Sequence, residues 1–141
     1  MISRILSFKL EKKGIKMTDC IFCNYNKSEI IAENKLAFAI MDRFPVNEGH
    51  TLIIPKRHFP FLFEASEEEI KAIYSLMYEV KEMLDIQYEP AGYNVGVNIG
   101  YYAGQTIKHL HVHLIPRYKG DVENPRGGVR NLKKALVEYD G

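Results

Sequence analysis

Three histidines alternate with apolar residues near the C-terminal end of the chain, in the segment His109-Leu110-His111-Val112-His113. Side chains alternate between the two faces of a β-strand, so a strand here places the three imidazoles on one face and the apolar residues on the other. This segment holds three of the five histidines in the sequence. Packing explains such a cluster poorly, because each buried ring nitrogen needs its own partner. The pattern predicts the floor of an active site.

The chemistry that such a face favours is transfer of a phosphorus-containing group. Same-face residues on a strand are about 6.5 to 7 Å apart, which suits three rings around one phosphate. Imidazole has an ordinary pKa of about 6.5, so much of it is a free nucleophile near pH 7, and a neighbouring imidazolium could neutralise oxyanion charge. Gly104, Gln105 and Thr106, just before the strand, offer close backbone approach and two donors to phosphate oxygens. We expect attack by His111 and a phosphohistidine intermediate.

Two alternative roles for the three histidines stay open. A His-x-His pair with a third histidine can hold a zinc ion that keeps one position for water, which would make a zinc hydrolase. The rings could also be structural residues with satisfied nitrogens. A third possibility, a nucleotide-binding module with negligible turnover, disagrees with the presence of the full set of histidines.

The two cysteines form a Cys-x-x-Cys motif at Cys20 and Cys23. They are too close together to staple a fold, and thioredoxin-type redox chemistry needs the motif at a helix start after a strand. Half of a zinc site is the favoured interpretation, with His58 and His109 as the candidates for the other two ligands. Reduced structural or redox thiols are the alternative.

The elements that must position these residues are strands and one helix. A capping box at Ser66–Glu69, followed by apolar residues at helical spacing, predicts an amphipathic helix from Ser66 to about Ile86. Its main apolar stripe is Ile70, Ile73, Tyr74, Met77, Val80 and Leu84. Short apolar runs between turn residues predict the strands, and the class is α+β with a mainly antiparallel sheet. These runs are Ile30–Ala32 with Leu36–Met41 as a hairpin, His50–Ile54, Tyr93–Ile99 and His109–Ile115.

Composition limits the partners. The 141 residues are 46% hydrophobic and carry 19 Lys and Arg against 18 Asp and Glu, so nothing favours a nucleic-acid polymer or a membrane. No apolar run approaches the roughly 18 to 20 residues that span a bilayer. Residues 1–16 are basic but lack a cleavage site, which argues against a signal peptide. They are interpreted as a flexible N-terminal extension, with a mis-set start before Met17 as the alternative. We expect one domain over residues 17–141 of a soluble, cytoplasmic protein.

The segment from Gly104 to Arg117 resembles the signature of the histidine triad family of nucleotide hydrolases and transferases. The resemblance extends to Asp42, Gly49–His58 and Asn98, so it covers about residues 18 to 120. It implies the histidine triad fold: a mainly antiparallel five-stranded sheet, one long helix and a short C-terminal element.

The resemblance also implies roles for individual residues. His111 would attack the α-phosphorus of a nucleotide and form a covalent nucleotidyl-histidine. Asp42 would bind the ribose hydroxyls, although capping the turn at Arg43–Pro45 explains this residue about equally well. The other implied contacts are His113 and His50 at the phosphates, with Asn98, Gln105 and Thr106 at the phosphate or the leaving group.

Zinc-carrying members of the family hold a structural ion with four ligands that match Cys20, Cys23, His58 and His109 in this sequence.

Pro116-Arg117 and the Gly-Gln-Thr-x-Lys run favour the fragile-histidine-triad branch, which cleaves dinucleoside polyphosphates. A phosphorylase acting on the same substrates is an alternative. The family further implies a homodimer, in agreement with surplus apolar residues on the helix, and a basic tail that approaches the partner's site. The residues concerned are Leu76, Met77, Tyr78 and Met83 on the helix, and Arg126 and Arg130 in the tail.

Overall fold

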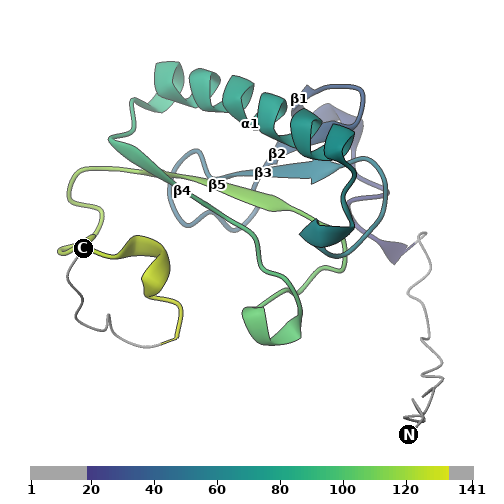
Figure 1. The fold of residues 1–141 in the computed structure, drawn as a ribbon. Coiled ribbons are helices and arrows are strands. Elements are labelled where there is room, and N and C mark those ends of the chain that lie inside the picture. The colour runs from purple at the N-terminus through teal and green to yellow at the C-terminus, as the bar shows by residue number, and fades with distance from the viewer. Residues whose placement is uncertain (1–18, 134–141) are drawn as a thin grey trace, which may run out of the picture.

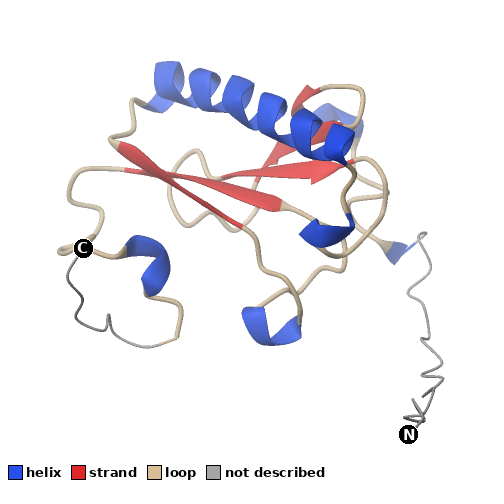
Figure 2. Cartoon of the chain, in the orientation of Figure 1, coloured by secondary structure: helices blue, strands red, loops and turns tan. Residues whose placement is uncertain are grey.

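The structure is a computed structural model that describes residues 19–133. The predicted extension at residues 1–16 lies outside this range, so it stays a prediction. Five antiparallel strands form one sheet, and Figures 1 and 2 show a single long helix lying across one face of it. The predicted α+β class is confirmed, including a short C-terminal element, η5. The elements are β1 (Ile30–Glu33), β2 (Ala37–Met41), β3 (Thr51–Pro55), α1 (Glu67–Tyr88), β4 (Gly92–Gly96), β5 (Val112–Arg117) and η5 (Gly128–Arg130).

The strand order is β1-β2-β3-β5-β4, with every neighbouring pair antiparallel. The predicted hairpin is confirmed as β1 and β2. The strand predicted over 109–115 begins only at Val112, because the backbone before it pairs elsewhere: the N–H of Leu110 donates to the carbonyl of Phe59 at 2.7 Å. His109 and His111 therefore stand outside the regular strand, and only His113 lies in the ladder, opposite Leu52.

The helix covers one face of the sheet with a four-residue stripe. Ile73, Leu76, Val80 and Leu84 are buried against the inward side chains of β2, β3 and β5. The predicted stripe was partly wrong. Ile70 and Tyr74 are exposed, and Leu76, predicted as surplus surface, is fully buried. The side of α1 that packs on the sheet follows helical spacing, i, i+3, i+4, counted from Ile73.

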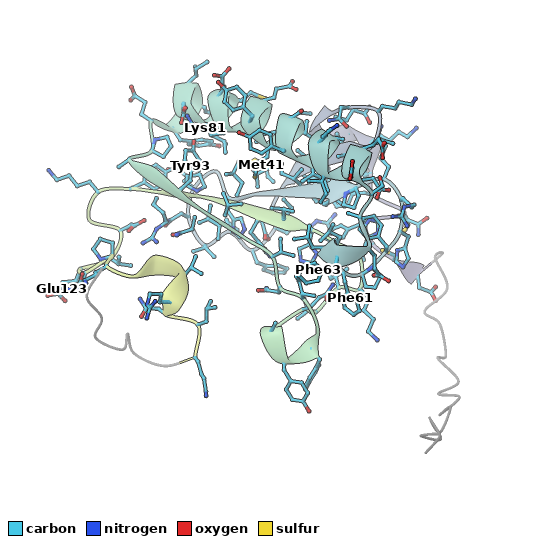
Figure 3. All side chains as sticks on the ribbon, in the orientation of Figure 1. Met41, Phe61, Phe63, Lys81, Tyr93 and Glu123 are labelled. Carbon is cyan, nitrogen blue, oxygen red and sulfur yellow. The ribbon has the colours of Figure 1, made fainter. Side chains whose placement is uncertain are left out.

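The beginning of α1 is tied to the loop after β3. Ser66 and Glu69 form the predicted capping box, and the buried Glu69 carboxylate receives two hydrogen bonds from Arg57, at 2.7 and 2.9 Å. At the other end, the Tyr93 hydroxyl of β4 donates to Asp85 of α1 at 2.8 Å, close to Lys81 (Figure 3). No helix within residues 19–133 has the length and apolar character to cross a bilayer.

The opposite face of the sheet is covered by the N-terminal segment. Phe38, Ile40, Leu52 and Ile54 form a second buried cluster on which Cys20 and Phe22 pack. The Cys-x-x-Cys motif therefore lies over the sheet face that α1 leaves open. The candidate site forms on this face.

Candidate active site and metal centre

A cavity of about 340 Å³ brings together five of the residues predicted for phosphate and nucleotide binding. They are Asp42, His50, Thr106, His111 and His113. Apolar and aromatic side chains, together with Arg43, supply the remaining wall: Ile21, Phe22, Tyr25, Ile40, Phe44, Val46, Leu52 and Ile107. A largely apolar pocket with a few convergent polar groups is the usual form of a small-molecule site.

The His111 ring is held in one tautomer. Its Nδ1 lies 2.8 Å from the carbonyl oxygen of His109, and a carbonyl only accepts, so Nδ1 carries the proton. The other nitrogen, Nε2, then has a free lone pair. His111 lines the cavity and is only 8% exposed, so the ring lies beside any ligand in the cavity and is largely shielded from bulk water.

The His50 and His113 rings form a directed pair. The backbone N–H of Val46 donates to Nδ1 of His50 at 3.0 Å, so the proton of this ring is on Nε2. That Nε2 lies 3.0 Å from Nδ1 of His113, which accepts, and the proton of His113 is on its own Nε2. This last N–H is buried and has no hydrogen-bond partner within residues 19–133. It is an unsatisfied donor, closed to solvent, on a residue that lines the cavity.

Both rings of this pair are neutral at pH 7. Burial lowers the pKa of His50, and the Asp42 carboxylate, 3.4 Å from Nε2, opposes the shift only partly. Burial is the main cause that lowers the pKa of His113, to about 4, and electrostatic interactions with His111 and His50 add to the shift. The sequence suggested a neighbouring imidazolium to neutralise oxyanion charge. In the free protein His113 instead offers a neutral N–H.

Two predicted phosphate contacts lie outside the cavity lining. The Gln105 amide accepts from the N–H of Gly100 and donates to the carbonyls of Pro60 and Ile107, so its polar atoms hold the loop that precedes the histidines. Asn98 is exposed on the segment after β4. The sequence interpretation missed Phe22 and Val46, although Phe22 was marked by its position inside the Cys-x-x-Cys motif.

Within residues 19–133, the segment that follows His113 contributes nothing to the cavity of its own chain. Arg117 makes paired hydrogen bonds to Asp121, at 2.8 and 2.9 Å, and a third to Asn94 at 2.7 Å. The guanidinium therefore fastens the segment after β5 to β4.

The four predicted metal ligands converge at one point, with ligand atoms that all lie within 4.8 Å of one another. Cys20 Sγ is 3.4 Å from His109 Nδ1, and Cys23 Sγ is 3.2 Å from His58 Nδ1. The two Nδ1 atoms are 3.1 Å apart. A tetrahedral zinc ion with two sulfur and two nitrogen ligands separates its ligand atoms by about 3.3 to 3.8 Å, close to these distances.

The His109 tautomer also fits a metal. Its Nε2 lies 2.8 Å from the carbonyl of Pro55, so the proton is on Nε2 and the lone pair of Nδ1 faces the two cysteines. Burial and the adjacent Cys20 raise the pKa of the Cys23 thiol to about 11, so capture of an ion must release thiol protons. The donor set and its arrangement suit zinc with four protein ligands.

A second group, Asp42, His50 and His113, also brings three ligand atoms within 4.8 Å. It does not suit a metal, because Val46 fixes the proton of His50 on the nitrogen that would have to bind the ion. The three triad rings do not share one site, in agreement with the assignment of His109 to the metal. His109 faces the cysteines, whereas His111 and His113 line the cavity. This division removes the geometric basis for a zinc ion held by all three.

Three histidines line the cavity, and two more lie in the Cys₂His₂ cluster beside it. Comparison with known sequences identifies the class of protein that this arrangement defines. The family profile of the HIT domain matches residues 24–120, and the chain belongs to this family. An uncharacterized 16.1 kDa HIT-like protein of Mycoplasma pneumoniae is 38% identical over 114 residues, which cover 78% of this chain and 79% of that protein. The bis(5'-adenosyl)-triphosphatase of Dictyostelium discoideum is 34% identical over 98 residues, or 70% of this chain and 66% of the relative.

Solved structures agree with the fold. A HIT family protein from Bacillus anthracis superposes with a TM-score of 0.68 at 34% identity, covering 73% of this chain and 76% of the other. A zinc-bound histidine triad family protein from Mycobacterium smegmatis gives a TM-score of 0.67 at 29% identity, covering 74% and 77%. The five-stranded sheet with one long helix is thus the fold of the family.

Proposed function

We propose that the protein cleaves dinucleoside polyphosphates or related nucleotide conjugates at the α-phosphorus, through a covalent nucleotidyl intermediate on His111. One observation carries this proposal: Nε2 of His111 holds a free lone pair in a cavity where Nε2–H of His113 has no partner within residues 19–133. Nucleophile and oxyanion donor thus line one cavity. The name of the Dictyostelium relative, a bis(5'-adenosyl)-triphosphatase, supports the substrate class.

In the first step, Nε2 of His111 forms a bond to the α-phosphorus while the bond from phosphorus to the leaving oxygen breaks. The electron pair goes to that oxygen, and Nε2–H of His113 stabilises its charge by a hydrogen bond. Water then attacks the phosphorus, the bond to Nε2 breaks, and a water proton passes to solvent. Asp42, which lines the same cavity and also caps the turn by accepting from the N–H of Phe44 at 2.8 Å, accepts hydrogen bonds from the ribose hydroxyls.

The neutral state of His113 favours anhydride substrates over phosphoramidates. A phosphate leaving group has a pKa near about 6, so it departs as an anion and needs only a hydrogen bond. An amine leaving group needs a proton, and burial lowers the pKa of His113, so in the free protein this ring is neutral at pH 7. The substrate class proposed is therefore the dinucleoside polyphosphates.

The test is a panel of diadenosine triphosphate, diadenosine tetraphosphate and adenosine phosphoramidate, with and without orthophosphate, followed by chromatography of the products. We expect AMP from both dinucleotides and slower cleavage of the phosphoramidate. If ADP replaces AMP when orthophosphate is added to diadenosine triphosphate labelled in its α-phosphates, the phosphorylase alternative is correct. Binding of AMP without any turnover would favour the nucleotide-binding module.

The same proposal includes a structural zinc ion on Cys20, Cys23, His58 and His109. An ion with four protein ligands has no open position for substrate, and it would cross-link the N-terminal segment to the loop after β3. The zinc-bound relative from M. smegmatis supports this assignment. Cysteines stay reduced in the cytoplasm, so Cys20 and Cys23 as metal ligands agree with the cytoplasmic location expected from the sequence.

We further propose a homodimer. The helix α1 exposes Tyr74, Tyr78, Met83 and Ile86, and β4 is an edge strand with Val95 exposed. The Tyr93 hydroxyl joins β4 to Asp85 of α1, so the edge strand lies beside the helix. A two-fold contact between copies of the chain would cover these apolar groups. The same contact would bring Arg126 and Arg130 toward the partner's cavity.

A further inference from the structure

The geometry points to a thermodynamic coupling between the metal centre and the nucleotide cavity. We infer that the Cys20–Cys23 segment is a wall of the nucleotide site that the metal ion holds in place, with Phe22 as the residue that transmits the effect. This inference rests on the proposed function, since it assumes both a bound ion and a nucleotide ligand.

Phe22 lies between the two sites. Its ring centroid is 5.8 Å from that of His109, a metal ligand, in an edge-to-face contact with an interplanar angle of 89°. The Phe22 ring centroid is also 5.3 Å from that of His111, the nucleophile, at an angle of 60°. Phe22 is 4% exposed and also lines the cavity. A displacement of this ring therefore changes the shape of the cavity and the packing of the His111 side chain together.

The backbone around Phe22 depends on the cysteines for its position. Residues 21–24 form a turn that belongs to no strand, and its backbone bond is local, from the N–H of Asn24 to the carbonyl of Cys20 at 3.2 Å. In addition to apolar packing, contacts between sulfur and imidazole nitrogen, at 3.2 to 3.6 Å, join this turn to distant loops. Thiols are weak hydrogen-bond partners, whereas thiolates on a metal ion are strong ligands. The ion thus determines how firmly the wall is held.

Coupling of this kind is reciprocal: if the ion tightens nucleotide binding by some factor, the nucleotide tightens ion binding by the same factor. Couplings between sites typically amount to about 5- to 150-fold. Direct contact through one buried aromatic ring leads us to expect at least about a fivefold effect.

The experiment measures both sides of this cycle with AMP as the probe. Calorimetry gives the affinity for AMP of the zinc-loaded protein and of chelator-stripped protein, at a temperature where circular dichroism shows that the stripped protein is folded. Competition with a chromophoric chelator gives the zinc affinity with and without saturating AMP. We expect AMP binding to weaken at least about fivefold on stripping and zinc binding to tighten by the same factor with AMP. Equal AMP affinities within about twofold would overturn the inference and leave the proposed function intact. No AMP binding by the zinc-loaded protein would remove both.

A variant that keeps every ligand separates this coupling from loss of the fold. Phe22→Leu preserves the four metal ligands and an apolar side chain but removes the aromatic contact with His111 and His109. We expect normal zinc content, weaker AMP binding and a coupling factor near one. Phe63→Ala is the matched control, because Phe63 (labelled in Figure 3) is 86% exposed on the short helix η3 (Leu62–Glu64) and does not line the cavity. An undiminished coupling factor in Phe22→Leu would show that Phe22 does not carry the effect.

Discussion

The Nε2 atom of His50 lies 3.0 Å from the Nδ1 atom of His113, and the N–H of Val46 on the far side of His50 determines which of these two nitrogens carries the proton. The two hydrogen bonds therefore run in one direction. The N–H of Val46 donates to His50, His50 donates to His113, and the Nε2–H of His113 is the last donor in the series. A proton added to His113 must occupy Nδ1, where it meets the proton of His50. Burial, together with this conflict, keeps His113 neutral.

The first prediction concerns the titration of His113. Its pKa of about 4 lies below the ordinary 6.5, so NMR of labelled histidines should place its midpoint well below those of exposed rings. Because the folded pKa is lowered, the unfolded chain binds more protons between pH 6.5 and 4. The stability contributed by this group is complete above pH 6.5 and is lost as the pH falls toward 4. In His50→Ala the midpoint should rise but stay below 6.5, since burial remains. A midpoint at or above 6 in the unmodified protein would contradict the tautomer assignment.

The second prediction concerns the nucleophile. His111→Ala should lower the turnover of diadenosine triphosphate by at least about a thousandfold, because loss of a nucleophile ordinarily costs several orders of magnitude. AMP affinity should change little, since the donors to phosphate remain. Zinc content serves as the control for folding and should be unchanged. Activity within about tenfold of the unmodified protein would exclude covalent catalysis by His111.

The third prediction concerns the metal. Cys20→Ser combined with Cys23→Ser should abolish zinc in elemental analysis and lower the melting temperature, because binding of a structural ion contributes to the free energy of folding. Chelator added to the unmodified protein should reproduce the loss of stability. Zinc that persists in the double variant, or a purified protein without zinc, would disprove the four-ligand assignment. In Phe22→Leu we expect no coupling between zinc and nucleotide. An immediate loss of rate when chelator is added to this variant would therefore indicate a catalytic ion instead.

Local sequence signals predicted most of the fold. The capping box at Ser66, the hairpin and the apolar runs located the helix and all five strands, because these features depend on residues close together in the chain. The helix face was harder. Ile70 and Ile73 are both apolar, and only packing against β2 and β3 decides that the second is buried. Periodicity alone cannot supply that information.

Side-chain alternation alone does not predict that the three triad histidines divide between two sites. Alternation placed His109, His111 and His113 on one strand face. Two long-range hydrogen bonds, from Leu110 to Phe59 and from His109 to Pro55, draw the start of the segment away from the ladder. Contacts across about fifty positions leave no periodic signal in the sequence. Only the Cys-x-x-Cys motif and the resemblance indicated that His109 belongs to the metal.

The fourth prediction concerns Glu69, whose pKa is lowered to about 2, first by hydrogen bonds from Arg57. A lowered carboxyl pKa contributes stability that is present above pH 4.5 and is lost as the pH falls toward 2. Glu69→Gln should therefore lower the free energy of unfolding at pH 7 by about 1 to 3 kcal/mol, as expected for a buried hydrogen bond to a charged group. It should also flatten the dependence of stability on pH between 4.5 and 2. Glu68→Gln, exposed on the same helical turn, is the matched control, and an equal effect there would refute the role of Arg57.

The fifth prediction concerns the assembly. Light scattering at low micromolar concentration should give about twice the single-chain mass of 16.3 kDa. Tyr78→Glu places a charge among the exposed apolar groups of α1 and should shift the mass toward a single chain, whereas Glu68→Lys at the first turn should not. A mass of 16.3 kDa for the unmodified protein would rule out a stable dimer and restrict the tail to its own subunit.

The metal ligands also have a consequence for the order of folding events. Cys20 and His109 are 89 positions apart, and the His109 ring is oriented by the carbonyl of Pro55 at the end of β3. In many small zinc modules the ligands are near neighbours, so the ion can nucleate the structure. Here the complete ligand set exists only after three remote segments have met, and closing such long loops is slow. Ion capture should therefore follow assembly of the sheet, so that the rate of zinc uptake by a refolding chain reports when the last native contacts form.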